Sequence, residues 1–169
     1  MAVFHIATAG SNTYTGGPGI DDYILYRDSP GPINANFITG VVTNGWGGTD
    51  AMSGMEGIFA SDYDDIIVCA VTGQYGVSVE GFAGADQFTG GDSTDNLQYD
   101  NSPGAIYVDL QAGFAYDGWG YTDTFTSFEN CENGTRYDDT LLGTDGSNSL
   151  MGNGGDDLID GRGGIDQVY

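Results

Sequence analysis

Aliphatic and aromatic residues recur every nine positions along much of this chain, each flanked by polar residues and preceded by a glycine-rich stretch. The repeat is most regular from Gly134 to Tyr169, which divides into four units, GTRYDDTLL, GTDGSNSLM, GNGGDDLID and GRGGIDQVY. Glycine stands first in each unit, aspartate or asparagine sixth and an aliphatic residue eighth. The last three residues of each unit are too few for a helix. They predict a three-residue strand whose central side chain points inward.

Seven earlier segments fit the same unit when they are aligned on glycine and aspartate or asparagine alone. They begin at residues 7, 16, 45, 60, 81, 90 and 118, and their eighth residues are Tyr14, Tyr23, Met52, Ile67, Phe88, Leu97 and Phe125. A hydrophobic content of 39% would place apolar residues there in about four of the eleven units, yet all eleven carry one. The pattern therefore predicts a solenoid in which stacked units share one core.

Four stretches depart from the pattern, at 25–44, 54–59, 69–80 and 99–117, of which 69–80 is expected to form a degenerate rung. Two of them belong to an internal duplication. The segment YRDSPGPINANFITGVVTNGWGGTD aligns with YDNSPGAIYVDLQAGFAYDGWGYTD at an offset of 73 residues. The sequence thus predicts one solenoid over 1–169, duplicated over about 7–68 and 81–142, with terminal repeats in 134–169.

The glycine-rich half of the unit has the chemistry of a calcium-binding turn. Glycine at positions 1, 2 and 4 allows positive φ and leaves backbone carbonyl oxygens uncovered. Aspartate at position 6 adds a carboxylate beside them. Ca²⁺ takes about six to eight oxygen ligands at about 2.3–2.6 Å, so these turns suit it. The alternative is that the aspartates only form turns by bonding to their own backbone.

The unit G-G-x-G-x-D-x-U-x resembles the RTX, or haemolysin-type, calcium-binding nonapeptide repeat. The resemblance implies an all-β fold, a parallel β-roll or β-helix solenoid in which two units make one turn and Ca²⁺ lies between stacked turns. By position, the turn containing Asp139 would share an ion with that of Asp157, and the turn containing Asn148 with that of Asp166.

We therefore expect several Ca²⁺ ions per chain. The candidate ligands are the side chains of Asn12, Asp21, Asp50, Asp65, Asp86, Asp95, Asp123, Asp139, Asn148, Asp157 and Asp166, and the backbone of Gly152, Gly155, Gly161 and Gly164.

The chain carries 25 acidic and three basic residues, for a formal net charge of −22. Its basic residues, Arg27, Arg136 and Arg162, are too few to neutralise phosphates, which excludes nucleic acid as a direct partner. Clustered carboxylates repel one another in a folded chain unless cations bind. We therefore expect folding and Ca²⁺ uptake to be one event.

No apolar run approaches the length of a membrane span, and the first ten residues, MAVFHIATAG, lack the regions of a signal peptide. RTX proteins commonly leave the cell through an uncleaved C-terminal signal, and no such tail follows the last repeat. We expect an extracellular or cell-surface location, reached either as part of a longer chain or by another export route.

Trp46 and Trp119 take position 2 of a glycine turn in the two copies, where a side chain is expected to point away from the core. They are candidates to stack on a glycan or a neighbouring protein, or else each covers the long rung before it. Cys69 and Cys131 lie about three solenoid turns apart, or roughly 16 Å, which is too far for a disulfide. We expect two free thiols, with Cys131 buried.

An enzyme is not expected. His5 is the only histidine and has no nucleophile motif beside it. Asp64 and Asp65 could suggest a glycosidase pair, but adjacent acids recur here with the repeat, as ligands do, and a catalytic pair would occur once.

Two functions fit these features. The first is a structural protein that forms head-to-tail homo-oligomers with Ca²⁺, because the chain begins and ends within repeats and no cap covers the last rung. The second is a Ca²⁺-triggered folding or secretion module of a larger secreted enzyme, toxin or adhesin. An ice-binding face is disfavoured, because position 5 has no uniform column of threonine or asparagine.

Overall fold

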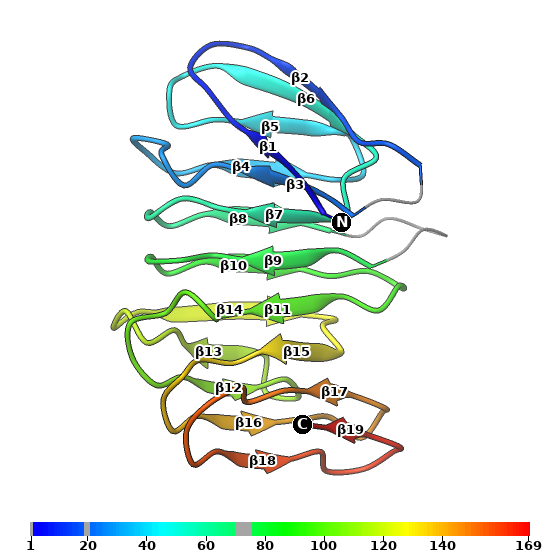
Figure 1. The fold of residues 1–169 in the computed structure, drawn as a ribbon. Coiled ribbons are helices and arrows are strands. Elements are labelled where there is room, and N and C mark those ends of the chain that lie inside the picture. The colour runs from blue at the N-terminus through cyan, green and yellow to red at the C-terminus, as the bar shows by residue number, and fades with distance from the viewer. Residues whose placement is uncertain (1, 19–20, 70–75) are drawn as a thin grey trace.

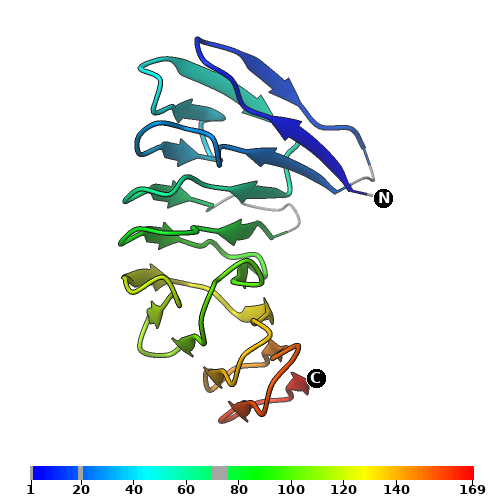
Figure 2. The same ribbon diagram turned by 60° about the vertical axis from the view of Figure 1, so that its left-hand side comes forward.

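The computed structural model describes residues 2–18, 21–69 and 76–169, and every regular element in these ranges is a β-strand. The chain passes between two sheets as it advances along the roll (Figure 1), and a turned view shows the sheets as two layers (Figure 2). This all-β roll of mainly parallel strands confirms the predicted fold class. None of the described segments is a helix that could cross a membrane.

The first sheet takes one strand from each rung, and its neighbouring strands are all parallel. Its eight strands, in spatial order, are β1 (Val3–Ile6), β3 (Asp22–Leu25), β7 (Gly57–Phe59), β9 (Ser78–Glu80), β11 (Asn96–Gln98), β15 (Asn130–Asn133), β17 (Ser149–Leu150) and β19 (Gln167–Val168). β9 lies in the predicted degenerate rung, whose residues 70–75 are outside the described residues.

The second sheet is larger and contains both parallel and antiparallel pairs. Its eleven strands, in spatial order, are β18 (Leu158–Asp160), β16 (Thr140–Leu142), β12 (Tyr107–Asp109), β13 (Phe114–Tyr116), β14 (Thr122–Thr126), β10 (Gln87–Thr89), β8 (Ile66–Val68), β4 (Asn34–Asn36), β5 (Val41–Thr43), β6 (Thr49–Ser53) and β2 (Thr13–Thr15).

The extra strands come from the duplicated segment, which forms an antiparallel meander in each copy: β4–β5–β6 is the first meander and β12–β13–β14 the second. Each meander starts beside the rung that follows it, with β4 against β8 and β12 against β16. The chain then turns back twice, so that β6 pairs with β2 and β14 with β10, in the preceding rung. The nine-residue pattern does not predict this reversal.

The first turn of each meander is built in the same way. The N–H of Gly40 donates to the carbonyl of Asn36, and that of Gly113 to the carbonyl of Asp109, both at 2.9 Å. These glycines have φ of 68° and 76°, and a Cβ on either would lie 2.5 Å from a carbonyl oxygen of the third strand. Glycine is therefore required both by the backbone conformation and by the close approach of the strands.

The inward-facing residues form one hydrophobic core between the sheets. Fully buried eighth-position side chains are those of Ile67, Leu97, Leu141 and Leu150. Cys69 and Cys131 are both buried free thiols, as predicted. Val168, by contrast, is 50% exposed, because β19 is an edge strand.

The two tryptophans do not project freely from the roll. Trp46 is partly buried and packs against the core, which contradicts the expected outward direction and agrees with the covering alternative. Trp119 is also partly buried, and its indole Nε1 is shielded from solvent without a hydrogen-bond partner.

Candidate calcium-binding turns

The sixth-position carboxylates hold their turns together through backbone N–H groups. Asp139 Oδ2 accepts the N–H of Thr135, in its own turn, at 2.6 Å, and Oδ1 accepts the N–H of Ile106, in a neighbouring rung, at 2.9 Å. Asp95 makes the corresponding pair of bonds at 2.6 and 2.7 Å. Each carboxylate therefore shapes one turn and links it to the next rung.

Turns two units apart stack on each other. The N–H of Asp139 donates to Asp157 Oδ1, and the N–H of Asn148 donates to Asp166 Oδ1, both at 2.9 Å. The structure thus brings together the two pairs of turns that the RTX resemblance expects to share ions.

A second column joins Asp65, Asp86 and Asp123 along the second sheet. The N–H of Asp65 donates to Asp86 Oδ1 at 2.8 Å, and the N–H of Asp86 donates to Asp123 Oδ1 at 3.1 Å. None of the three is more than 1% exposed. Asp50, in the first meander, accepts the N–H of Asn12 from the adjacent rung in the same way, at 2.7 Å.

Glycine lets oxygen atoms crowd together in these columns. A Cβ at Gly155 or Gly164 would lie 2.5 Å from a carbonyl oxygen of the turn stacked on it, and both residues have positive φ. A Cβ at Gly152 or Gly161 would instead collide with the carboxylate of that turn's own sixth residue. The four predicted glycines therefore make room for a column of carbonyl and carboxylate oxygens.

The sixth position of the second unit is Asp22, and its assignment to Asp21 is wrong. Asp22 is 2% exposed and accepts the N–H of Gly17 at 2.7 Å, whereas Asp21 is exposed. This bond spans five residues and the corresponding bonds elsewhere span four, so the turn is one residue longer than the repeat. The inward residue shifts accordingly, from Tyr23 to the fully buried Ile24.

Asp22 also pairs with the only histidine of the chain. His5 Nε2 lies 2.9 Å from Asp22 Oδ1, and this hydrogen bond lowers the pKa of the Asp22 carboxyl. The contact gives His5 a partner on the adjacent strand β3.

Two glutamates bond to the stacked turns although the nine-residue repeat does not predict them. Glu56 accepts the N–H of Asp22 and Glu129 accepts the N–H of Asp95, each at 2.9 Å. They lie 73 residues apart, at the offset of the duplication, and this offset is the one sequence signal that could have identified them.

Most carboxylates in the described parts of the chain have no cationic partner. The two ion pairs there are His5–Asp22 and Arg162–Asp109. Burial raises the pKa of Asp65 to about 6 and that of Glu80 to about 7. Such shifts mean that the folded chain disfavours the charged form of these groups, and a bound cation would reverse that preference.

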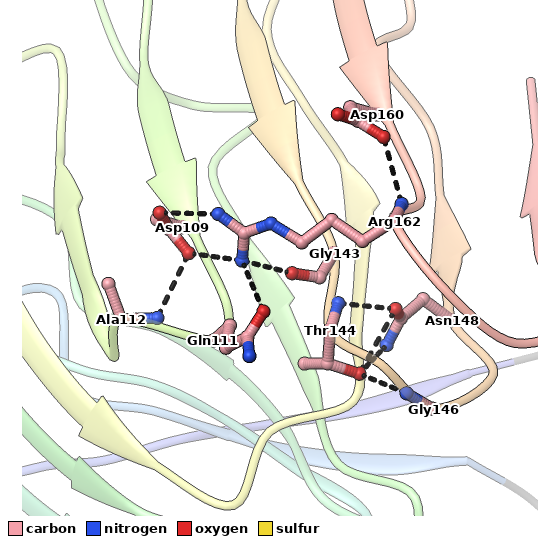
Figure 3. Close-up of polar contacts among 9 residues, drawn as sticks. All are labelled: Asp109, Gln111, Ala112, Gly143, Thr144, Gly146, Asn148, Asp160 and Arg162. Carbon is pink, nitrogen blue, oxygen red and sulfur yellow. Dashed lines mark hydrogen bonds and ion pairs between the residues drawn. The ribbon is translucent and has the colours of Figure 1, made fainter.

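Arg162 supplies a protein cation at the C-terminal turns (Figure 3). Its guanidinium donates to both carboxylate oxygens of Asp109, at 2.7 and 2.8 Å, and to the carbonyl of Gly143 at 2.6 Å. In the same turn, Asn148 Oδ1 accepts the N–H of Thr144 at 2.7 Å. Arg162 thus donates to a carbonyl of the two stacked turns that contain Asn148 and Asp166. It also links these turns to the second meander.

The residues of the turns fit a hard, oxygen-binding cation. Within the described ranges, no three His, Cys, Asp or Glu side chains gather into a metal cluster. Ca²⁺ would therefore need backbone carbonyls beside single carboxylates, and the glycine columns supply both kinds of oxygen.

The fold and the turns define a class of protein, a parallel β-roll built from glycine–aspartate turns. A family model, the RTX calcium-binding nonapeptide repeat, matches in four copies at residues 72–97 and 133–168. No curated protein matches the chain. The chain thus contains RTX calcium-binding nonapeptide repeats over these residues.

Proposed function

We propose that this chain is an extracellular structural protein, without enzymatic activity, that folds on Ca²⁺ and assembles end to end. The observation that carries the proposal is the apolar surface at both ends of the roll. At the C-terminal end Leu158 is 63% and Ile165 84% exposed, and at the N-terminal end Phe4 is 54% and Ile6 64% exposed. These residues lie on or beside the strands that end the two sheets.

Edge strands support association because their outer backbone groups have no partner strand. β18 and β19 end the sheets on one side, and β1 and β2 on the other. Such edges are templates for strands of another molecule. A further rung stacked there would pair with these edges and cover part of the exposed apolar surface.

Charge explains why association would depend on Ca²⁺. A chain with a net charge of −22 repels its own copies. Bound Ca²⁺ lowers that charge and stiffens the terminal turns that present the edge strands. Extracellular calcium-binding modules have Kd values of about 10⁻⁴–10⁻³ M, which suits a protein that acts outside the cell.

The absence of enzymatic activity is proposed from the pattern of the acids. Asp65 is buried and bonded to Ser61 and Ile33, and Asp64 accepts the N–H of Ala85. Both therefore serve the turn column rather than an open catalytic pair.

A Ca²⁺ titration of the full chain, followed by circular dichroism and light scattering on one sample, tests the proposal. We expect the β-signal and the particle mass to rise together. Ile165→Glu should block the rise in mass and leave the β-signal intact, while Ile38→Glu, at a residue 60% exposed on the first turn of the first meander, should change neither. A β-signal that rises on a monomer would contradict assembly.

The second candidate is a folding or secretion module of a larger secreted protein, and the same open C-terminal edge favours it. Additional residues of a longer chain would pair with β18 and β19 in place of another molecule. A folded, Ca²⁺-loaded monomer that stays monomeric at high concentration would support this candidate.

A further inference from the structure

The two meanders share a buried tyrosine–aspartate bond. Tyr26 donates its hydroxyl to Asp50 Oδ2 at 2.8 Å in the first, and Tyr99 donates to Asp123 Oδ2 at 3.0 Å in the second. All four residues are at most 2% exposed. Any difference in the groups around these two aspartates is therefore a difference in the interior of the protein.

In the first meander, side-chain amides surround the aspartate. Asn44 Nδ2 donates to Asp50 Oδ2 at 2.9 Å and to the carbonyl of Gly10 at 2.8 Å. Asn12 Nδ2 donates to Asp50 Oδ1 at 3.2 Å. Asp50 is thus one buried carboxylate with hydrogen-bond donors on both oxygens.

In the second meander, acids replace both amides. Asp117 stands where Asn44 does, at the offset of 73, and Asp86 takes the sixth position that Asn12 holds in the preceding rung. The second copy therefore has three buried carboxylates where the first has one. Among the described residues, the two ion pairs both lie elsewhere in the chain.

Asp117 is fixed in place with one oxygen unsatisfied. Its Oδ1 accepts the N–H groups of Trp119, Gly120 and Tyr121, each at 2.9 Å. Its Oδ2 is buried without a hydrogen-bond partner, and the residue is 0% exposed. Leaving a buried carboxylate oxygen without a partner is unfavourable, so the arrangement points to a partner that supplies positive charge.

The first meander shows where that partner would lie. There the amide nitrogen of Asn44 sits between Asp50 Oδ2 and the carbonyl of Gly10. The corresponding groups in the second meander are Asp123 Oδ2 and the carbonyl of Gly84, the fourth residue of its unit as Gly10 is of its own. Both groups that correspond to the acceptors of Asn44 are therefore oxygens.

We infer that the second meander holds a Ca²⁺ ion between Asp117 Oδ2, Asp123 Oδ2 and the carbonyl oxygen of Gly84, which we name the Asp117 site. Asp117 precedes the first glycine of its unit and lies outside the segments that match the RTX repeat, so the repeat does not account for the part of Asp117 in this site. A surface depression lined by Asp117, Gly118 and Tyr121 lies beside the site.

The charge around the site agrees with this assignment. Asp86 and Asp123 are 1% and 0% exposed, and neither belongs to an ion pair in the described parts of the chain. A divalent cation would stabilise these groups as carboxylates. The alternative, a proton held on one of the acids, makes a different prediction in the experiments below.

The first experiment counts Ca²⁺ ions bound to the full-length chain by calorimetry and native mass spectrometry. Asp117→Asn recreates the amide of the first meander, where asparagine fits the same turn. We expect this variant to bind one ion fewer per chain and to melt at a higher temperature than wild type in chelator. An unchanged ion count would overturn the inference.

The second experiment does not depend on the Asp117 variant. Tb³⁺ replaces Ca²⁺ and emits when a nearby tryptophan is excited. Trp119 is two residues from Asp117, and its backbone N–H donates to Asp117 Oδ1. We expect Trp119→Phe to lose most of the tryptophan-sensitised emission, and Trp46→Phe or Asp157→Asn to keep it. Emission that depends on Trp46 instead would contradict the site. Neither experiment measures assembly, so the outcome is separate from that of the proposed function.

Discussion

The first and second meanders have the same strand order, the same glycine turns and the same buried tyrosine–aspartate bond, yet their interiors differ in charge. Asn12 and Asn44 satisfy Asp50 in the first, while Asp86 and Asp117 crowd Asp123 in the second. The same backbone arrangement therefore accommodates either amide or acidic side chains around its buried aspartate. In the second case a cation has to be supplied from solution.

Removal of Ca²⁺ should have the largest effect. Each ion present at about 100 times its Kd contributes about 2.7 kcal/mol to stability, so several ions together approach the total stability of a domain, about 5–15 kcal/mol. We expect chelation to lower the melting temperature sharply and to reduce the β-signal in circular dichroism. Equal melting curves with Ca²⁺ and with chelator would contradict a calcium-dependent fold.

Asp50→Ala should produce the largest effect of a single substitution, about 3–5 kcal/mol of unfolding free energy, because it leaves the buried Tyr26 hydroxyl without its acceptor and removes one acceptor each from Asn12 and Asn44. Urea denaturation measures the loss. Asp123→Ala is the matched variant in the second meander. In chelator its loss of unfolding free energy should be smaller than that of Asp50→Ala, because it also removes repulsion between Asp123 and the neighbouring carboxylates. A larger loss would argue against the difference in charge between the two meanders.

Acidic pH should stabilise the calcium-free protein. Glu80 is 1% exposed, and burial raises its pKa from 4.5 to about 7. The folded state therefore binds the proton more tightly, so this stability is present below about pH 4.5 and is lost as the pH rises through about 7, an effect on the order of 3 kcal/mol. Melting temperatures from pH 5 to pH 8 in chelator should fall for wild type. Glu80→Gln should flatten the slope, and an unchanged slope would assign the pH dependence to other acids.

Asp109→Asn should have the smallest effect, about 1 kcal/mol, because the pair with Arg162 is partly exposed to solvent. The loss should appear as earlier melting of the terminal rungs. Asn36 holds the corresponding place in the first meander, at the offset of 73. Arg162 bonds to Asp109 and not to Asn36, so Asn36→Asp should leave the melting of the terminal rungs unchanged.

The roll could be predicted because its signal is local and repeated. Position 8 of the unit identified the buried Ile67, Leu97 and Leu141 from spacing alone, and stacked units need no long-range information. Asp22 was missed because one additional residue in a turn shifts a pattern that cannot show which of two adjacent aspartates faces inward.

The meanders could not be predicted from the repeat. The sequence shows a turn at Gly40, but the pairing of β4 with β8 joins a strand to a rung that comes later in the chain. That choice depends on tertiary packing. The exchange of Asn44 for Asp117 is visible in the aligned copies, yet only their burial and their contacts with Asp50 and neighbouring N–H groups show that it changes the interior.

Hydrogen–deuterium exchange of the full chain, with Ca²⁺ and with chelator, tests the account most directly because it reports on each rung. We predict that chelator removes protection from β10, β14 and the terminal strands β16 to β19, while β5 and β6 of the first meander keep most of theirs. Equal loss in both meanders, or no loss in either, would contradict the claim that calcium dependence follows the acids that replace amides.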